Sequence, residues 1–313
     1  MSAADRLVPV NAIDMLVAEE GRGPLVILCH GWPELSYSWR HQMPALAAAG
    51  FRVAAPDMRG FGRTSAPLDV GAYSILDMVG DMVALVAALG EEQAVIVGHD
   101  WGAQVAWHCA LFRPDVFTAV AGLSVPPGRR GSGPPLEMLK AQGIGNFYWH
   151  YFQEPGIAER EFESDVDRTM REVLFGRGLS LMVDPGRGFL GAPGTPEPLP
   201  SWLREEDVAR FVEAFARTGF RGGLNWYRNI DRNWQLTAPW QDARILQPAL
   251  FIAGARDAVI RGPIGEKRLR DMDAVVPRLS KKLIIEGAGH WIQQERPADV
   301  NAALLEFLQQ LPR

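Results

Sequence analysis

A buried strand, a tight glycine turn and a helix follow one another directly around position 100. Residues 94–97 read Ala-Val-Ile-Val, a continuous apolar run that is typical of a strand covered on both faces. Residues 98–102 read Gly-His-Asp-Trp-Gly, and a helical pattern continues from there to Phe112. The glycines permit a strained turn, so Asp100 between them is presented at the end of the strand, beside a helix N-terminus that favours negative charge. We interpret residues 98–102 as a nucleophile elbow.

The same alternation of strand and helix continues on both sides of this turn. It predicts an α/β fold, with a mainly parallel sheet and helices on both of its faces. Two short strands in residues 7–18 are expected to form a hairpin at the sheet edge. Ser74 and Gly90 are the expected N-cap and C-cap of one helix. The other predicted strands are residues 25–29, 53–55, 94–97, 117–125, 249–253 and 282–285, and the predicted core helices are residues 38–49, 74–89, 102–112 and one that starts near Pro297.

The alternation stops at Pro126 and resumes only after residue 239. No strand pattern between these positions is convincing. We therefore predict a core formed by residues 1–125 and 240–313, and an inserted helical cap formed by residues 126–239.

The predicted cap has helical patterns at residues 159–175 and 205–216. Between them lie the Gly/Pro-rich residues 184–200, which are too irregular for a helix or a strand. We regard this stretch as a candidate border of the substrate entrance.

Composition excludes several classes of partner. The formal net charge of the 313 residues is −5 and no basic run resembles a nucleic-acid footprint, so no nucleic-acid partner is expected. The apolar runs are far shorter than the ~20 residues of a membrane span, and residues 1–10 lack the pattern of a signal peptide. Cys29 and Cys109 lie in apolar elements, which predicts buried thiols rather than a disulfide framework or a metal site. We expect a cytoplasmic protein, either a monomer or a homodimer.

The residue type at the elbow points to a class of substrate. A serine there would attack an acyl carbon, and on an sp³ carbon it would leave an ether that a histidine-activated water cannot hydrolyse. A carboxylate that attacks an sp³ carbon leaves an alkyl ester, and water can then attack the carbonyl of that ester. Asp100 therefore indicates alkyl electrophiles, such as epoxides or haloalkanes, as substrates.

Two further residues complete a candidate catalytic set. Asp257 follows the strand at residues 249–253, and His290 follows the strand at residues 282–285. The order nucleophile, acid, histidine is that of α/β-hydrolases. We expect His290 to take a proton from water and Asp257 to orient the imidazole. The other place for the acid, after residues 117–125, offers no carboxylate.

Hydrogen-bond donors are needed for both steps of such a reaction. Backbone N–H groups of Trp32 and Trp101 are the candidates for an oxyanion hole around the ester of Asp100. An epoxide oxygen also needs a donor, and a tyrosine that stays protonated at neutral pH suits this task. Tyr151 and Tyr227 lie in distinctive cap segments, although a cap tyrosine taken from composition alone is more often a packing residue.

Five segments spread along the chain form a recognisable set: residues 30–34 (His-Gly-Trp-Pro-Glu), 98–102, 151–155 (Tyr-Phe-Gln-Glu-Pro), 225–229 (Asn-Trp-Tyr-Arg-Asn) and 289–291 (Gly-His-Trp). With these segments the chain resembles the soluble epoxide hydrolases of the α/β-hydrolase fold over nearly its whole length. The resemblance implies that Tyr151 and Tyr227 jointly hold and protonate the epoxide oxygen, and that the enzyme uses no metal or organic cofactor. Tyr148 and His150 are rival donors close to Tyr151.

Two other functions remain as alternatives. A haloalkane dehalogenase would use the same Asp100, and the indole N–H groups of Trp32 and Trp101 could hold a halide, but the two tyrosines would then have no role. A relative that binds a ligand without catalysis would have no need of the complete acid–base set. Epoxide hydrolysis to a vicinal diol is therefore the predicted function, with a small epoxide as the substrate.

Overall fold

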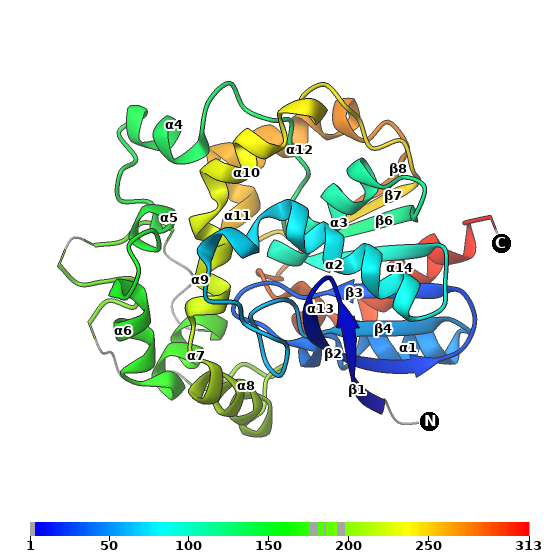
Figure 1. Cartoon of the computed structure of the whole chain (residues 1–313), viewed down its shortest axis with the longest axis horizontal. Helices are drawn as coiled ribbons and strands as arrows, with labels where there is room; N and C mark the ends of the chain where they lie inside the picture. Colours follow the sequence, from blue (N-terminus) through cyan, green and yellow to red (C-terminus); the bar gives the residue numbers. More distant parts are fainter. Residues whose placement is uncertain (1–3, 176–180, 185, 193–197, 313) are drawn as a thin grey trace.

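The computed structural model describes residues 4–175, 181–184, 186–192 and 198–312, and its centre is an eight-stranded sheet (Figure 1). The strand order is β1-β2-β4-β3-β5-β6-β7-β8. β2 is antiparallel to both of its neighbours, β1 and β4, and every other neighbouring pair is parallel. The mainly parallel sheet and the N-terminal hairpin are therefore confirmed. The strands are β1 (Ala4–Val10), β2 (Ile13–Gly21), β3 (Leu25–Cys29), β4 (Arg52–Pro56), β5 (Ala94–His99), β6 (Phe117–Leu123), β7 (Ala249–Gly254) and β8 (Leu279–Ile285).

Helices cover both faces of this sheet. Ile27 in β3 faces a buried cluster that includes residues of α2 (Ile75–Ala88), α3 (Trp101–Phe112) and α12 (Pro263–Val275). Its neighbour Leu28 faces a second cluster with α1 (Gln42–Ala48) and α14 (Pro297–Gln309). Because side chains alternate along a strand, a strand that is apolar at every position must be covered on both sides.

The helix predicted at residues 38–49 is interrupted. A 3₁₀ helix, η1 (Ser36–Trp39), comes first, and α1 begins separately at Gln42. Pro44 lies in the first turn of α1, where its missing N–H group costs nothing, and a helix continuing through it from Ser38 would lose a hydrogen bond. α2 begins as expected: Ser74 and Asp77 form a capping box, and Gly90 follows its end with φ +81°. The sequence analysis did not predict α12.

The regular elements in the described residues of the insertion between β6 and β7 are helices, and these residues add no strand to the sheet. Figure 1 shows these helices to the left of the sheet. Of the irregular stretch at residues 184–200, residues 185 and 193–197 lie outside the described residues. The helices are α4 (Pro135–Ala141), α5 (Tyr148–Tyr151), α6 (Ile157–Glu163), α7 (Val166–Phe175), α8 (Glu205–Thr218), α9 (Arg221–Arg228) and α10 (Ile230–Leu236).

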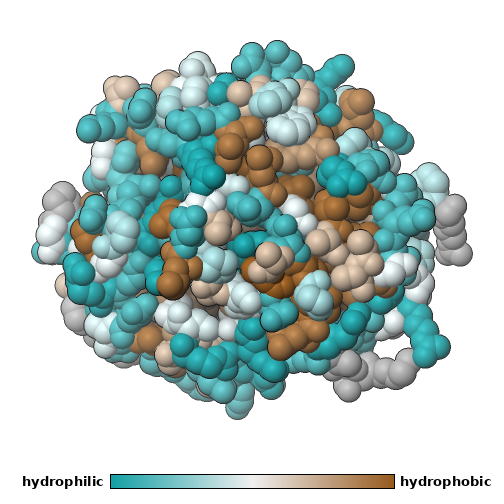
Figure 2. Space-filling view, in the orientation of Figure 1, coloured by the Kyte–Doolittle hydropathy of each residue, from teal (hydrophilic) through white to brown (hydrophobic). Residues whose placement is uncertain are grey.

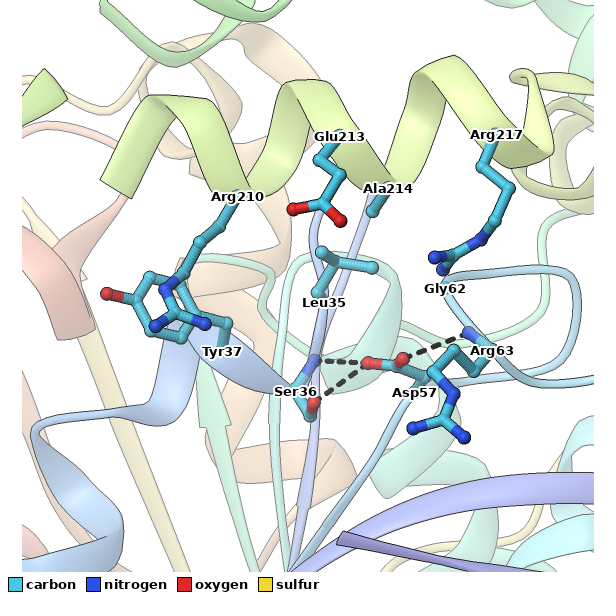
Figure 3. A pocket seen from close by; sticks show the side chains of 10 residues that line it. All are labelled: Leu35, Ser36, Tyr37, Asp57, Gly62, Arg63, Arg210, Glu213, Ala214 and Arg217. Carbon is cyan, nitrogen blue, oxygen red and sulfur yellow. Dashed lines mark hydrogen bonds between the residues drawn. The ribbon is translucent and has the colours of Figure 1, made fainter. Parts of the chain in front are cut away.

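Polar contacts fasten α8 to the loop that follows β3. The hydroxyl of Tyr37 donates to Asp207 Oδ1 at 2.7 Å, and Arg40 Nε lies 3.3 Å from the same oxygen. These contacts border a solvent-open hollow of about 160 Å³, over which the guanidinium of Arg210 stacks on the Tyr37 ring (Figure 3). No residue of the candidate catalytic set lines this hollow, so we assign it to the seam between α8 and the core rather than to the active site.

Candidate active site

The elbow is strained as its sequence predicts. Asp100 has φ 51° and ψ −119°, a conformation that a side chain rarely adopts. The flanking glycines are required because a Cβ atom at Gly98 would lie 2.0 Å from the carbonyl oxygen of Gly102. A Cβ atom at Gly102 would lie 2.0 Å from the carbonyl oxygen of Cys29 on the neighbouring β3. The tight packing of elbow against β3 therefore fixes the direction of the Asp100 side chain.

The three predicted catalytic residues meet at the carboxyl ends of β5, β7 and β8. His290 Nδ1 lies 3.0 Å from Asp257 Oδ2, and His290 Nε2 lies 3.7 Å from Asp100 Oδ2. Asp257 Oδ1 accepts the N–H of Val259 at 2.8 Å, so both oxygens of this carboxylate are occupied. All three side chains are largely buried, Asp257 almost completely. His290 therefore bridges Asp100 and Asp257.

Charge and burial act in opposite directions on these groups. Burial alone would lower the pKa of His290, but the charge of Asp257 and the hydrogen bond and charge of Asp100 outweigh it and hold that pKa well above its usual range. Burial would raise the pKa of Asp257, and the charge and hydrogen bond of His290 reverse this and lower it. The imidazole is therefore held as a cation between two carboxylates.

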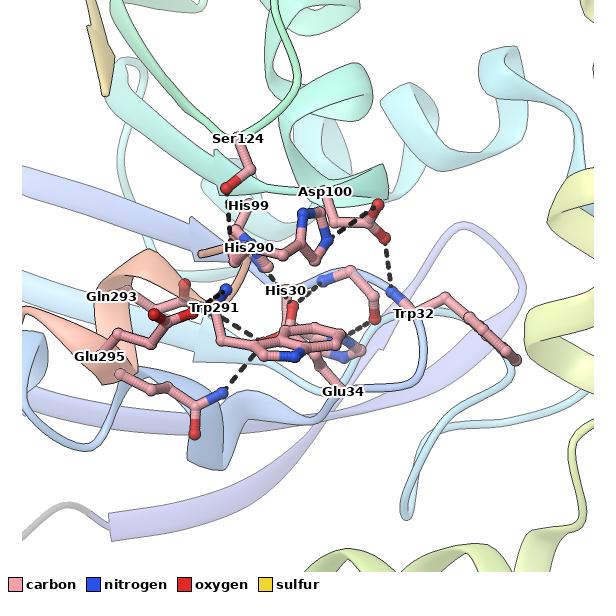
Figure 4. A network of polar contacts seen from close by, with 12 residues as sticks. His30, Trp32, Glu34, His99, Asp100, Ser124, His290, Trp291, Gln293 and Glu295 are labelled. Carbon is pink, nitrogen blue, oxygen red and sulfur yellow. Dashed lines mark hydrogen bonds and ion pairs between the residues drawn. The ribbon is translucent and has the colours of Figure 1, made fainter. Parts of the chain in front are cut away.

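One of the two backbone donors predicted for an oxyanion hole contacts Asp100. The backbone N–H of Trp32 donates to Asp100 Oδ1 at 2.9 Å (Figure 4). Trp101 is the first residue of α3, so its N–H has no acceptor within the helix. The two carboxylate oxygens are thus distinguished: Oδ1 faces a backbone donor and Oδ2 faces His290.

A buried polar network centred on Glu34 contacts the backbone of His290, and no role for Glu34 was predicted from the sequence. Glu34 accepts the N–H of Gly31 at 2.9 Å and the side-chain amide of Gln293 at 2.8 Å, and His99 Nδ1 lies 2.6 Å from Glu34 Oε2 (Figure 4). His99 Nε2 donates to the carbonyl oxygen of His290 at 2.8 Å. These contacts give His99 a structural role, because it links Glu34 to the backbone of His290.

The carboxyl group of Glu34 is ionised in this network. Burial would raise its pKa, but the charge and hydrogen bond of His99 outweigh it and lower the pKa of Glu34 to about 2. Glu34 is the last residue of the His-Gly-Trp-Pro-Glu segment at residues 30–34, but the sequence pattern assigned it no role. The network joins the loop that carries Trp32 to the loop that carries His290.

The ring of Tyr227, one of the two predicted donors, packs beside Trp32 and Trp101. This tyrosine is buried, and its ring makes edge contacts with Trp32 at 5.7 Å and with Trp101 at 5.1 Å between centroids. Tyr148 is the tyrosine beside it, 5.6 Å away between ring centroids. Desolvation raises the pKa of both hydroxyls. The charge of Asp100 raises the pKa of Tyr148 further, and the charges of Tyr148 and Asp100 raise that of Tyr227. Both remain protonated donors.

The structure does not place Tyr151 beside Tyr227, which corrects the expectation from the sequence. The hydroxyl of Tyr151 donates to Glu161 Oε2 at 2.7 Å, at the other end of the four-residue helix α5 from Tyr148. The carboxylate of Glu161 on α6 is a charged acceptor, and hydrogen bonds to charged acceptors are strong. The sequence pattern does not show which of two tyrosines within four residues lies beside Tyr227, and the structure places Tyr148 there.

Two further expectations concern absences. Among the described residues, no group of three or more His, Cys, Asp or Glu side chains is arranged to hold a metal ion. No helix in the described part of the chain is long and apolar enough to cross a membrane. Cys29 and Cys109 are both buried and free, as predicted.

Comparisons with known proteins point in one direction. A family model for the α/β hydrolase fold matches residues 24–297. The chain is 46% identical to epoxide hydrolase A of Mycobacterium tuberculosis over 97% of each chain, and 42% identical to epoxide hydrolase 2 of Siraitia grosvenorii over 96% of each. Among solved structures, an epoxide hydrolase from Vigna radiata superimposes with a TM-score of 0.95 at 39% identity, covering 99% of this chain and 98% of its own. These relatives match the insertion as well as the sheet.

Proposed function

The chain belongs to the epoxide hydrolases of the α/β-hydrolase fold, and we propose that Asp100, His290 and Asp257 carry out its hydrolysis of an epoxide to a vicinal diol. The observation that carries this assignment is the position of Asp100, with Oδ1 on the N–H of Trp32 and Oδ2 facing His290. A carboxylate held in this way presents one oxygen to the substrate and keeps the other in a polar cradle.

In the first step, Asp100 Oδ2 attacks a ring carbon of the epoxide. A C–O bond forms to Asp100 as the C–O bond of the ring breaks, and the electron pair goes to the former ring oxygen. Tyr148 and Tyr227 hold this oxygen, and one of their hydroxyls supplies the proton that converts it to an alcohol. We assign this role to Tyr148 rather than to Tyr151, because Tyr148 contacts Tyr227 and feels the charge of Asp100.

In the second step, water attacks the carbonyl carbon of the Asp100 ester. The esterified Asp100 no longer carries the negative charge that helped to raise the pKa of His290, so the imidazolium can return a proton to the tyrosine that donated one in the first step. The neutral imidazole then acts as the base and takes one proton from the attacking water. The negative charge that develops on Oδ1 is stabilised by the N–H groups of Trp32 and Trp101. As the tetrahedral intermediate collapses, the bond between Cγ and Oδ2 breaks and the remaining proton of the water passes to Oδ2. The diol departs with Oδ2, and Asp100 retains one oxygen from water.

The domain bounds predicted from the sequence are kept in the proposal. Residues 126–239 act as a cap over the core formed by residues 1–125 and 240–313, and this cap carries Tyr227 and, in place of the predicted Tyr151, Tyr148. The substrate is a small epoxide, the reaction needs no metal or organic cofactor, and the protein acts in the cytoplasm as a monomer or a homodimer.

A single turnover in ¹⁸O-labelled water tests the covalent step. With enzyme in excess over a racemic aryl epoxide, the oxygen added to the first-turnover diol comes from Asp100, so mass spectrometry should find unlabelled diol and one ¹⁸O in the peptide that contains Asp100. Labelled diol in the first turnover would mean direct attack by water and would contradict the proposal. Asp100→Asn serves as the control and should form no diol while deamidation is excluded by mass spectrometry.

The same assay with chloro- and bromoalkanes addresses the dehalogenase alternative. One observation is in its favour: the indole Nε1 of Trp32 is buried without a hydrogen-bond partner. We expect no halide release, because a dehalogenase would leave the hydroxyls of Tyr148 and Tyr227 without a role.

A further inference from the structure

Glu161, on α6, binds the backbone of a cap segment that comprises residues 188–191. Its Oε2 accepts the N–H of Phe189 at 3.0 Å and its Oε1 accepts the N–H of Leu190 at 2.9 Å. The hydroxyl of Tyr151 donates to Oε2 at 2.7 Å, so the carboxylate receives three hydrogen bonds. Hydrogen bonds to a charged acceptor are the strong ones, and together they fix the segment to α6.

The segment is shaped to receive this carboxylate. Gly188 has φ +72°, and a Cβ atom there would lie 2.3 Å from Glu161 Oε1, so only glycine permits the approach. Arg168 on α7 donates to the carbonyl oxygen of Gly191 at 2.8 Å. The segment is therefore held from two helices, at the two ends of a short stretch that contains Phe189.

The ring of Phe189 lies against residues of the active site. It is 5.8 Å from the ring of Tyr148 and 6.2 Å from that of Trp32, between centroids, and 5.1 Å from that of Phe152. Phe189 is only partly buried, so its ring is not closed off on every side. It thus stands beside both the donor that we assign to the epoxide oxygen and the residue whose N–H holds Asp100.

Two backbone hydrogen bonds join residues 181–183 to the segment that contains Tyr148. The N–H of Tyr148 donates to the carbonyl oxygen of Leu181 at 2.9 Å, and the N–H of Val183 donates to that of Asn146 at 2.7 Å. The backbone that leads to Phe189 therefore pairs with the backbone that carries Tyr148, and the position of one ring constrains the other.

We propose that Phe189 forms a wall of the epoxide pocket that selects among substituents, and that Glu161 and Tyr151 are positioning residues that hold this wall in place. The inference rests on the proposed function. Discrimination between substrates responds to small changes of shape, since one methylene changes kcat/KM about 10- to 200-fold. If the segment were released from Glu161, Phe189 would be free to move and the pocket would change shape. We expect this change to reduce selectivity and to leave the acid–base chemistry unchanged.

The test is the ratio of kcat/KM for the two enantiomers of styrene oxide. We expect Phe189→Ala and Glu161→Ala to change this ratio in the same direction, each by roughly fivefold or more. Tyr151→Phe removes one of the three hydrogen bonds and should give a smaller change of the same sign. In the Glu161→Ala background, Tyr151→Phe should add nothing, because the hydroxyl acts only through that carboxylate.

Glu163→Ala is the matched control. Glu163 lies on the same helix and also accepts a backbone N–H within the cap, that of Phe220 at 3.0 Å, but it does not touch residues 188–191. Its loss should leave the enantiomer ratio unchanged.

An unchanged ratio in Phe189→Ala would overturn the proposal, and so would a change in Phe189→Ala that neither Glu161→Ala nor Tyr151→Phe shares. If Glu161→Ala does not fold, Tyr151→Phe and Phe189→Ala still decide the outcome. Failure of the proposed function is distinguishable, because the unmodified enzyme would then form no diol from either enantiomer.

Discussion

Replacing Gly31 with alanine would disturb the oxyanion hole by a steric change alone. A Cβ atom at Gly31 would lie 2.4 Å from Asp100 Cβ and 2.5 Å from Asp100 Oδ1, whereas ordinary contacts begin at 3.4 Å. Either the Asp100 carboxylate or the backbone at Gly31 and Trp32 must therefore move by about 1 Å, the difference between 3.4 and 2.4 Å. Oδ1 is the same atom that accepts the N–H of Trp32 at 2.9 Å, so this hydrogen bond is the one that is lost.

The expected effect follows from how much one oxyanion donor contributes to kcat. Removal of one oxyanion donor lowers kcat about 10²- to 10³-fold, and a misplacement of about 1 Å costs about 10²-fold. We expect kcat of Gly31→Ala to fall by roughly two orders of magnitude. Hydrolysis of the Asp100 ester should slow more than its formation, because the oxyanion develops in the hydrolytic step.

Stopped-flow measurement of Trp fluorescence in single turnovers would separate the two rates. Gly131→Ala is the matched control, since the nearest atom to its new Cβ would be the carbonyl oxygen of Gly133 at 3.7 Å. Near-ultraviolet circular dichroism would show that both variants fold. A folded Gly31→Ala enzyme whose ester hydrolysis stays within threefold of the original rate would refute the role given to the N–H of Trp32.

Three further predictions concern protons and donors. Tyr148→Phe and Tyr227→Phe should each slow formation of the ester by about 10- to 100-fold, and the double variant should form no ester that quench-flow and mass spectrometry detect. An unchanged rate in Tyr148→Phe would return the donor role to another cap residue. The rate of ester hydrolysis should rise with pH, and its kinetic pKa should lie below the pKa that nuclear magnetic resonance gives for His290 in the free enzyme. The reason is that the charge of Asp100, which helps to raise the pKa of His290, is absent from the ester. A rate that falls with pH would exclude His290 as the base. Because the folded-state pKa of Glu34 is lowered from 4.5 to about 2, its contribution to stability is present above pH 4.5 and is lost as pH falls toward 2. Glu34→Gln should therefore weaken the acid dependence of the melting temperature in that range. An unaltered dependence would argue against an ionised Glu34.

The sequence predicted those parts of the site that depend on local chemistry and on chain order. Glycines at 98 and 102, between an apolar run and a helical pattern, can form little else than a strand–turn–helix junction, and the structure contains that junction. Asp257 and His290 follow the next parallel strands in the order that brings their side chains to the same edge of the sheet. These inferences needed only the geometry that all parallel sheets share.

The donors in the cap required the tertiary structure. Tyr148 and Tyr151 are separated by three positions in a helix of four residues, and the sequence around them does not show which hydroxyl meets Tyr227. That choice depends on Glu161, which lies on another helix and takes the hydroxyl of Tyr151.

The role of Glu34 was likewise decided by residues distant in sequence. Its partners His99 and Gln293 are 65 and 259 positions away. The sequence by itself thus predicted that Asp100, Asp257 and His290 meet at one edge of the sheet, because strand order and turn chemistry are encoded locally. The tertiary structure decided which tyrosine contacts Tyr227 and what holds the backbone of His290, because a side chain turns toward whichever partner the fold brings within reach of a hydrogen bond.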